Sequence, residues 1–326
     1  MVTDIARLRG SQVPLVTPFR AGRFDEAAFR ELVEFQIAEG SHGIGCTGTT
    51  GEPTSLTPEE REFVIETAVG AARGRVPVLA GTGSTNFDET LRFTRFARQA
   101  GADAALVIVP YYNRPSQEGL YRHFRAVADD VPDLPIILYN IPGRSAVNLA
   151  PETIARLARD CPNIVGVKEA NKDFDQVSQD LDRVKRLAGR GDFLVYSGIE
   201  TLCFPMLCLG GAGHVSATGN VLPRQVAELF NLTEAGRWRE ARDLHYELLA
   251  MNEVLFIETN PGPVKGALGL MGKIDPELRL PLAPLAPENE AKLRAVLGEY
   301  GLPGDGRQPA PRDERALATA TAEDGD

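Results

Sequence analysis

Short apolar segments alternate along this chain with longer segments in which apolar residues recur at helical spacing. Each short segment is an almost continuous apolar run, which is typical of a parallel strand covered on both faces. In the first long segment Phe29, Leu32 and Val33 form one apolar stripe, as an amphipathic helix requires. The predicted strands are residues 13–17, 43–47, 76–81, 104–110, 135–140, 164–169, 193–197 and 213–217.

Eight strands separated by helices predict an α/β fold, a TIM (β/α)8 barrel. A doubly wound open sheet is the alternative, but it usually has fewer strands and opens a helix with a Gly-x-Gly-x-x-Gly loop. The Gly-Thr-Gly at 81–83 is not followed by the third glycine of that motif. The barrel is therefore the favoured architecture.

The strand pattern stops near residue 223, which divides the chain into three parts. Residues 1–222 are predicted to form the barrel and 223–302 a C-terminal helical domain, with one long helix expected over 234–256. Residues 303–326 are rich in Pro, Gly, Ala, Asp and Arg and poor in large apolar side chains, so this tail is predicted to be disordered.

Charge and composition narrow the expected partners. The chain of 326 residues has a net charge of −10, so phosphate backbones and anionic lipids repel it, and neither nucleic acid nor a membrane is an expected partner. No apolar run reaches the roughly 20 residues of a membrane span, and the N-terminal residues show no secretion signal. Four scattered cysteines favour a reducing compartment, which makes the cytoplasm the expected location. Four isolated histidines predict no metal site.

Active-site residues of a barrel lie at the carboxyl ends of the strands, which makes Lys168 the most informative residue. It follows the apolar run 164–167, and strand alternation turns Lys168 and Glu169 to opposite faces. Burial disfavours a charged lysine, and a neutral amine is the nucleophile that forms a Schiff base with a carbonyl. A lysine paired with a carboxylate at the barrel rim is the alternative, and position alone does not decide between the two.

Other strand ends carry hydroxyl groups and a guanidinium. The Gly-Thr-Thr-Gly loop at 48–51 offers hydroxyls and backbone N–H groups to a carboxylate or phosphate, although such loops are often only structural. Tyr112 and Tyr139 are phenols that either pack with one hydrogen bond each or, beside a lysine, form a proton relay. Arg144 could bind a substrate carboxylate or make a rim salt bridge.

Together and in order, these motifs resemble the dihydrodipicolinate synthase and N-acetylneuraminate lyase family of pyruvate-dependent class I aldolases. The resemblance covers residues 13–300 and implies a TIM barrel with a C-terminal helical domain, assembled as a homotetramer. The matching motifs are Gly-Thr-Thr-Gly-Glu at 48–52, Gly-Thr-Gly at 81–83, Pro-Tyr-Tyr-Asn-Arg-Pro at 110–115, Tyr-Asn-Ile-Pro-Gly-Arg at 139–144, Val-Lys-Glu at 167–169, Ser-Gly at 197–198 and Asn-Pro-Gly-Pro-Val-Lys at 260–265.

The resemblance implies a role for each matching residue. Lys168 would form the Schiff base with pyruvate. Tyr139 would be the central acid and base, exchanging protons with Thr49 and with Tyr112 reaching across from a neighbouring subunit. No cofactor or metal is implied, because the iminium is itself the electron sink. Thr49 and Thr50 would hold the pyruvate carboxylate, Arg144 would bind the carboxylate of the incoming aldehyde, and Val215 would complete the substrate-binding set.

The motifs favour the synthase branch of this family, which condenses pyruvate with aspartate semialdehyde in lysine biosynthesis. The lyase branch typically has a serine in the first motif and lacks Arg144. Ile199 and Glu200 depart from the pair of acids that is usual in the synthase. They leave a catabolic aldolase as the alternative, one that releases pyruvate and succinate semialdehyde from 2,4-dihydroxyhept-2-ene-1,7-dioate.

The resemblance also bears on feedback inhibition by lysine. Lysine-inhibited members tend to have Asn where this chain has Thr85, and His where it has Pro58 and Arg61. Glu89 and Tyr111 match the lysine-binding pattern. We therefore hypothesise that lysine inhibits this protein weakly or not at all.

Two other classes of function make different predictions. A non-catalytic relative would lack the lysine or a relay residue, but Lys168, Tyr139, Tyr112 and Thr49 are all present. A metal-dependent class II aldolase on the same barrel would lose activity with EDTA, which we do not expect.

Overall fold

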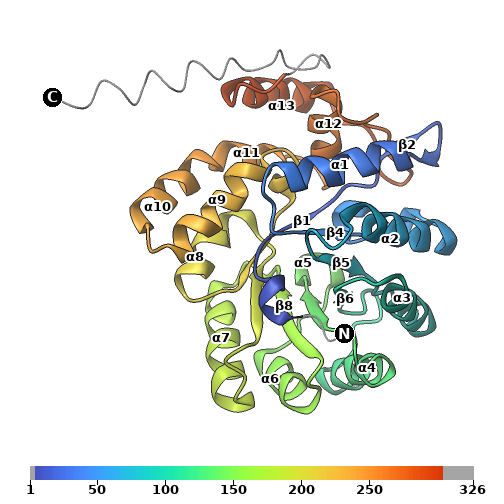
Figure 1. The fold of residues 1–326 in the computed structure, drawn as a ribbon, viewed down its shortest axis with the longest axis vertical. Helices are drawn as coiled ribbons and strands as arrows, with labels where there is room; N and C mark the ends of the chain where they lie inside the picture. The colour runs from blue at the N-terminus through green and yellow to red at the C-terminus, as the bar shows by residue number, and fades with distance from the viewer. Residues whose placement is uncertain (1–3, 304–326) are drawn as a thin grey trace.

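The computed structural model describes residues 4–303 and confirms the predicted barrel. Eight parallel strands close on themselves in chain order, and each predicted segment contributes one of them (Figure 1). The barrel strands are β1 Gly10–Pro14, β4 Gly43–Cys46, β5 Val78–Gly81, β6 Ala104–Ile108, β7 Ile136–Asn140, β8 Ile164–Glu169, β9 Leu194–Ser197 and β10 Gly213–Val215.

The strand boundaries differ from the predicted ones where burial and pairing do not coincide. β1 begins three residues earlier than predicted, because Ser11 and Gln12 are polar but fully buried at the barrel floor. Gln12 donates a hydrogen bond from Nε2 to the Leu8 carbonyl, which gives its buried amide NH2 group a partner there. At the other end Thr47 and Val109 stay buried after their strands have ended. An apolar run in the sequence indicates buried residues, so it can extend beyond the residues that pair in the sheet.

Helices surround the barrel, and their starts follow from local sequence. Thr57 caps α2: its hydroxyl accepts from the Glu60 N–H, and the Glu60 carboxylate accepts from the Thr57 N–H. Apolar side chains such as Val107, Phe124 and Val127 fill the layer between strands and helices. The helices up to the last strand are α1 Glu26–Ala38, α2 Pro58–Ala72, α3 Phe87–Ala100, α4 Gln117–Asp130, α5 Pro142–Ser145, α6 Pro151–Asp160, α7 Phe174–Ala188 and α8 Cys203–Cys208.

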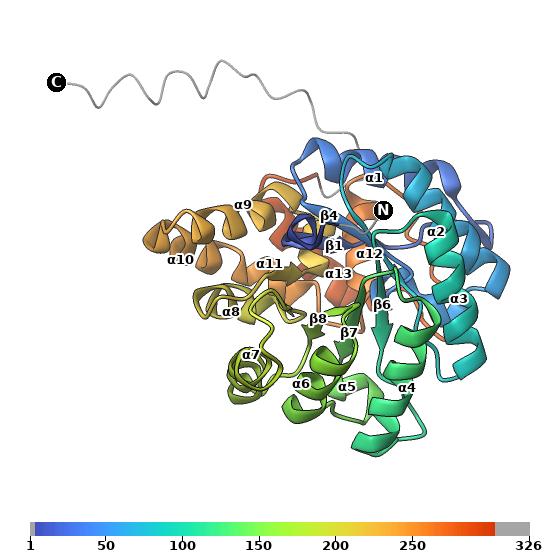
Figure 2. The same cartoon turned by 60° about the horizontal axis from the view of Figure 1, so that its bottom comes forward.

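The chain after β10 forms helices packed against one side of the barrel (Figure 2). Residues 234–256 do not form the single helix that was predicted, since α10 ends at Glu247 and α11 begins at Leu249. Leu268 and Leu293 share a buried cluster with Leu32 of α1. The C-terminal helices are α9 Pro223–Glu234, α10 Trp238–Glu247, α11 Leu249–Val254, α12 Gly262–Leu270 and α13 Pro287–Glu299. The predicted disordered tail lies, except for Pro303, outside the described residues.

A two-stranded hairpin, β2 Phe19–Arg20 and β3 Arg23–Phe24, was not predicted. Its strands are too short to show an apolar pattern. Ala21 and Gly22 have φ of +50° and +76°, as a two-residue hairpin turn of the favoured type requires. Phe19 forms an isolated bridge with Pro276, so the hairpin connects the N-terminal segment to the C-terminal one.

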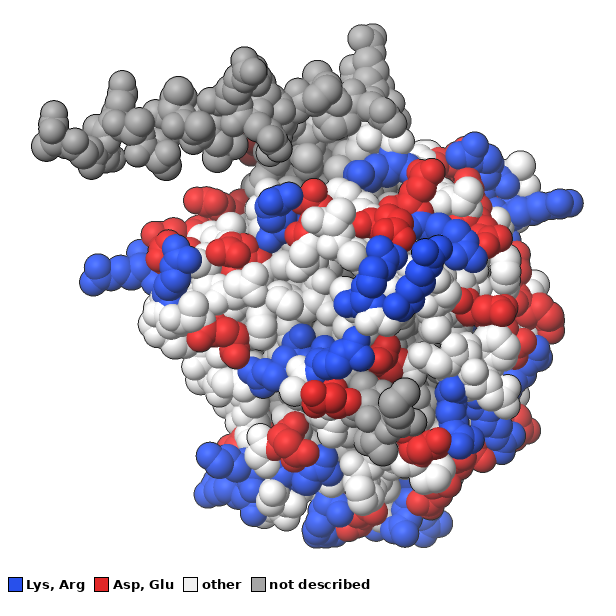
Figure 3. Space-filling view, in the orientation of Figure 1, with Lys and Arg blue, Asp and Glu red and all other residues white. Residues whose placement is uncertain are grey.

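The surface mixes charges of both signs, as the face in Figure 3 shows. Many of these charges are paired between neighbouring helices: Arg95 of α3 with Asp130 of α4, and Arg98 with Asp133 just beyond α4. Along residues 4–303 no helix has both the length and the apolar character needed to cross a membrane.

Candidate active site

Lys168 lies at the carboxyl end of β8, flanked in register by Tyr139 of β7 and Tyr196 of β9. It is 6% exposed, and its Nζ lies 4.2 Å from the centroid of the Tyr139 ring. The amine is therefore in cation–π contact with this ring. Within residues 4–303 no carboxylate oxygen lies within ion-pair distance of Lys168 Nζ. The geometry therefore differs from a lysine held in a rim salt bridge, and it leaves the amine available to a carbonyl carbon.

The neighbouring strand end leaves room for the lysine stem. A Cβ on Gly198 would lie 2.8 Å from Lys168 Cε and 2.9 Å from Ala170 Cβ, which is closer than such contacts allow. Glu200 follows, 8% exposed, and its Oε1 accepts a hydrogen bond from the Ala217 N–H at 2.8 Å. Burial raises the pKa of Glu200, while hydrogen bonds and the positive charge of Lys168 oppose that shift. Sequence reasoning had noted Glu200 only as a departure from the family pattern.

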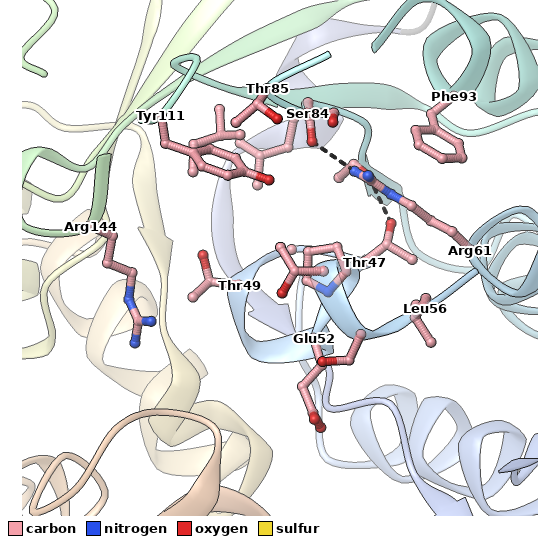
Figure 4. Close-up of a pocket in the computed structure, with 18 of the residues that line it drawn as sticks. Thr47, Thr49, Glu52, Leu56, Arg61, Ser84, Thr85, Phe93, Tyr111 and Arg144 are labelled. Carbon is pink, nitrogen blue, oxygen red and sulfur yellow. Dashed lines mark hydrogen bonds between the residues drawn. The ribbon is translucent and has the colours of Figure 1, made fainter. Parts of the chain in front are cut away.

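Thr49 and Tyr139 meet at the mouth of the barrel. Thr49 lies in the 3-10 turn Thr49–Gly51, and its Oγ1 is 3.2 Å from the Tyr139 hydroxyl. Tyr139 is 4% exposed. Both side chains line a pocket of about 450 Å³. Arg144 and Arg61 line it as well, and Figure 4 shows them around the pocket together with Thr49. The structure thus brings together the Thr49 hydroxyl, which the sequence placed at one strand end, with the Tyr139 phenol and the Arg144 guanidinium, which it placed at another.

Thr50 is buried behind this pocket and is held by a residue from the far end of the chain. Its Oγ1 accepts a hydrogen bond from Asn260 Nδ2 at 3.0 Å. The carbonyl of the same Asn260 accepts from Arg144 Nη2 at 3.2 Å. Sequence reasoning quoted Asn260 only as part of the motif at 260–265, and this linking position was missed. In the sequence, only the place of Asn260 at the start of that motif indicated that it belongs to the site.

Neither Tyr112 nor Val215 lines this pocket. Tyr112 is 89% exposed, has a φ of +71° and is not part of the pocket wall. Val215 ends β10 and is buried in the barrel interior in the same apolar cluster as Tyr139. A single chain therefore does not place the Tyr112 phenol beside Tyr139 and Thr49.

A buried pair of carboxyl groups lies directly behind the lysine, on the outer face of β8. Glu169 accepts hydrogen bonds from Asn140 Nδ2, at 3.1 and 3.0 Å, and from the Asn171 N–H at 2.8 Å. Asp180 of α7 is fully buried and, within residues 4–303, neither of its oxygens accepts a hydrogen bond. Burial and the adjacent charge of Glu169 raise the pKa of Asp180 to about 10, so the pair shares a proton at neutral pH.

This proton makes stability depend on pH. Folding raises the pKa of Asp180, so the folded state keeps a proton that the unfolded state releases above about pH 4. The free energy of unfolding therefore falls as pH rises from about 4 toward about 10. Asp180→Asn removes that titration, so we expect its melting temperature relative to wild type to increase from pH 5 to pH 9. Asp182→Asn, on the exposed side of the same helix, is the control. Equal pH dependence of Asp180→Asn and wild type would contradict the shared proton.

Within residues 4–303, no three His, Cys, Asp or Glu side chains lie close enough together to hold a metal ion. The ionisable groups around the strand-end lysine include the Tyr139 phenol and the Glu200 carboxyl. These groups suit amine and proton-transfer chemistry on a carbonyl compound.

Fold and site together fit a barrel enzyme of the class I lyase type, with a buried lysine amine at a strand end. The comparison with known families agrees. The chain belongs to the Dihydrodipicolinate synthetase family, whose model matches residues 7–300. The family resemblance of the motifs is thereby confirmed.

Individual relatives are similar over almost their whole length. A 4-hydroxy-tetrahydrodipicolinate synthase of Thermus thermophilus is 51% identical over 294 residues, 90% of this chain and 97% of the relative. A synthase of the same name from Syntrophobacter fumaroxidans is 52% identical over 90% of this chain and 99% of its own. The crystal structure of dihydrodipicolinate synthase from Aquifex aeolicus has a TM-score of 0.88 at 47% identity, covering 90% of this chain and 99% of its own.

Proposed function

We propose that this protein is a 4-hydroxy-tetrahydrodipicolinate synthase, which condenses pyruvate with aspartate semialdehyde through a Schiff base on Lys168. The observation that carries the proposal is the unpaired Lys168 amine beside Tyr139, whose hydroxyl is within hydrogen-bond range of Thr49. Relatives at about 50% identity that bear the synthase name support this choice over a catabolic aldolase.

The first half of the reaction uses the amine and the phenol. The Lys168 amine attacks the ketone carbon of pyruvate, and loss of water gives an iminium ion. The iminium withdraws electrons, so a proton leaves the adjacent methyl group and an enamine forms. The Tyr139 hydroxyl, 3.2 Å from Thr49 Oγ1, is the group positioned to carry protons in these steps.

The second half forms the carbon–carbon bond. The enamine carbon attacks the aldehyde carbon, and Tyr139 returns a proton to the oxygen that becomes the hydroxyl group. The amino group of aspartate semialdehyde then attacks the iminium carbon, which closes a six-membered ring and releases the Lys168 amine. Succinate semialdehyde has no amino group, so it cannot release the enzyme in this way.

Two groups at or directly behind the pocket wall suit the carboxylates of the substrates. Thr50, in the turn after β4, suits the pyruvate carboxylate together with the neighbouring N–H groups of that turn. Arg144 lines the pocket with its guanidinium bonded to one backbone carbonyl, which leaves other N–H groups for the carboxylate of the aldehyde. The barrel-interior position of Val215 supports a contact with bound pyruvate.

The experiment compares kcat/KM for aspartate semialdehyde and succinate semialdehyde with saturating pyruvate. We expect a strong preference for aspartate semialdehyde, because its amino group completes the ring and frees the lysine. A preference for succinate semialdehyde would overturn the proposal and indicate a catabolic aldolase.

We further propose that the protein acts as a homotetramer in the cytoplasm. The exposure of Tyr112, 89% in the single chain, supports a role for this phenol at a neighbouring subunit's site. Four free cysteines, three of them buried, support a reducing compartment. Family membership does not fix the assembly, since a monomeric dihydrodipicolinate synthase variant matches this chain with a TM-score of 0.89 at 40% identity, over 93% of this chain and all of its own.

We expect lysine to be a weak inhibitor. Arg61 is buried in the pocket wall, where its Nη2 donates to the carbonyls of Gly81 and Gly83 at 2.7 and 3.0 Å. The positive charge of Arg61 repels the ammonium groups of free lysine, whereas Glu89, which lines the same pocket, attracts them. Activity assayed with millimolar lysine should be nearly unchanged, and strong inhibition would contradict the hypothesis.

A further inference from the structure

A buried ion pair joins the Thr49–Gly51 turn to the C-terminal helices. Lys265 of α12 donates from Nζ to Glu52 Oε1 at 2.5 Å, and both side chains are completely buried. Lys265 Nζ also donates to the Glu277 carbonyl at 2.7 Å and lies 4.1 Å from the ring centroid of Phe19. Neither charge takes part in the proposed chemistry, so the pair needs another explanation.

Stability does not explain this pair. Burial raises the pKa of Glu52 and lowers the pKa of Lys265, and the charge of each partner opposes the shift of the other. Removing two charges from water costs about as much as their attraction returns, and apolar residues of similar volume often serve stability as well or better. Glu52 Oε2 has no hydrogen-bond partner within residues 4–303, which adds to the cost.

The backbone at Glu52 shows what the pair holds in place. Glu52 is left-handed, with φ +52° and ψ +47°, a conformation that residues with a Cβ adopt uncommonly. Its N–H donates to the Thr49 carbonyl at 3.2 Å and so closes the turn that carries Thr49 and Thr50. The ion pair fixes the side chain of the residue that ends this turn.

Two hydrogen bonds complete the attachment of the turn. Thr17 Oγ1 donates to the Gly51 carbonyl at 2.7 Å, and Asn260 Nδ2 donates to Thr50 Oγ1 at 3.0 Å. Thr50, Gly51 and Glu52 are therefore each bonded to a residue from another part of the chain. Thr17 comes from the segment after β1, and the other two partners come from the C-terminal region. The turn in this position places Thr49 Oγ1 3.2 Å from the Tyr139 hydroxyl.

We propose that Glu52 and Lys265 are positioning residues, which set the Thr49–Gly51 turn for pyruvate binding and proton transfer. The inference rests on the proposed function, because it assigns the turn to the pyruvate carboxylate. It also gives the C-terminal helices a role in the barrel's chemistry, through α12.

The test replaces the pair with two unbranched apolar residues, Glu52→Met/Lys265→Met. Borohydride trapping is measured against pyruvate concentration, together with the melting temperature. We expect the half-saturating pyruvate concentration to rise by about 10-fold, because a displaced turn binds the carboxylate less well. The trapped fraction at saturating pyruvate should be unchanged, since Lys168 is intact. A pair with only a structural role would change the melting temperature and leave half-saturation alone.

Controls separate the possible outcomes. Glu34→Gln/Arg75→Gln removes an exposed ion pair, also 2.5 Å long, between α1 and the segment after α2, and it should behave as wild type. Native half-saturation in the folded Met pair overturns the positioning role. If the Met pair does not fold, Glu52→Asp decides: it keeps the charge but is one methylene shorter, and native half-saturation there overturns the role equally. Wild type that is not trapped overturns the proposed function, and the positioning role with it.

Discussion

Lys168→Ala should abolish turnover while leaving the protein folded. The amine is the only group in the proposed mechanism that bonds covalently to pyruvate, so we expect kcat to fall by at least about 10³-fold, as for other catalytic nucleophiles. The side chain is at the end of β8 against the Tyr139 ring, and its loss removes little from the apolar core. The steady-state rate and the circular dichroism melting curve measure the two effects.

Lys172→Ala is the matched control for this substitution. Lys172 follows β8 by three residues and is exposed, so its removal should leave both rate and melting curve unchanged. A Lys168→Ala enzyme that kept substantial activity would end the Schiff-base assignment.

Tyr139→Phe should lower kcat by about 10²- to 10⁴-fold, the usual contribution of a positioned acid or base. The substitution keeps the ring that contacts Lys168 and removes only the hydroxyl that is 3.2 Å from Thr49 Oγ1. We therefore expect pyruvate still to be trapped by borohydride, more slowly, while carbon–carbon bond formation is strongly impaired. Single-turnover rates with each substrate separate these two steps.

Tyr196→Phe provides the comparison within the same barrel. Tyr196 flanks Lys168 on the other side, but its hydroxyl donates to the Leu8 carbonyl at 2.7 Å, toward the N-terminal end of the barrel. Loss of that buried hydrogen bond should reduce stability by about 1 kcal/mol and leave kcat nearly unchanged. Similar kcat losses in the two phenylalanine variants would contradict a specific relay role for Tyr139.

The sequence predicted those features of the fold that show as a local, repeating pattern of apolar residues. All eight barrel strands and the strand-end position of Lys168 follow from apolar runs in chain order. The hairpin at Phe19–Arg20 and Arg23–Phe24 was missed, because two-residue strands have no period to detect. The break between α10 and α11 was missed as well, since a continuous apolar stripe crosses it.

The missed parts of the site depend on contacts between distant segments. Glu52 and Lys265 each end a motif quoted from the sequence, but the two are 213 positions apart, and neither motif shows that their side chains pair. Asp180 reads as a polar residue of an amphipathic helix, and only the packing of α7 on β8 buries it beside Glu169. Charged residues of this kind are found from the fold, because nothing in their neighbourhood along the chain indicates burial.

Tyr112 illustrates a different limit. The resemblance of the motif at 110–115 implied a role at a neighbouring subunit, and in the single chain Tyr112 does not line the pocket and is 89% exposed. That role is a property of an assembly, so it stays a prediction. The proposed homotetramer would supply the missing contact.

The central claim is that Lys168 forms a Schiff base with pyruvate. The most direct measurement treats the wild-type protein with pyruvate and borohydride, then locates the modified peptide by mass spectrometry. We predict one reduced pyruvate adduct per chain, on Lys168, and none in the absence of pyruvate. No adduct, or an adduct on another lysine such as Lys172, would contradict the account.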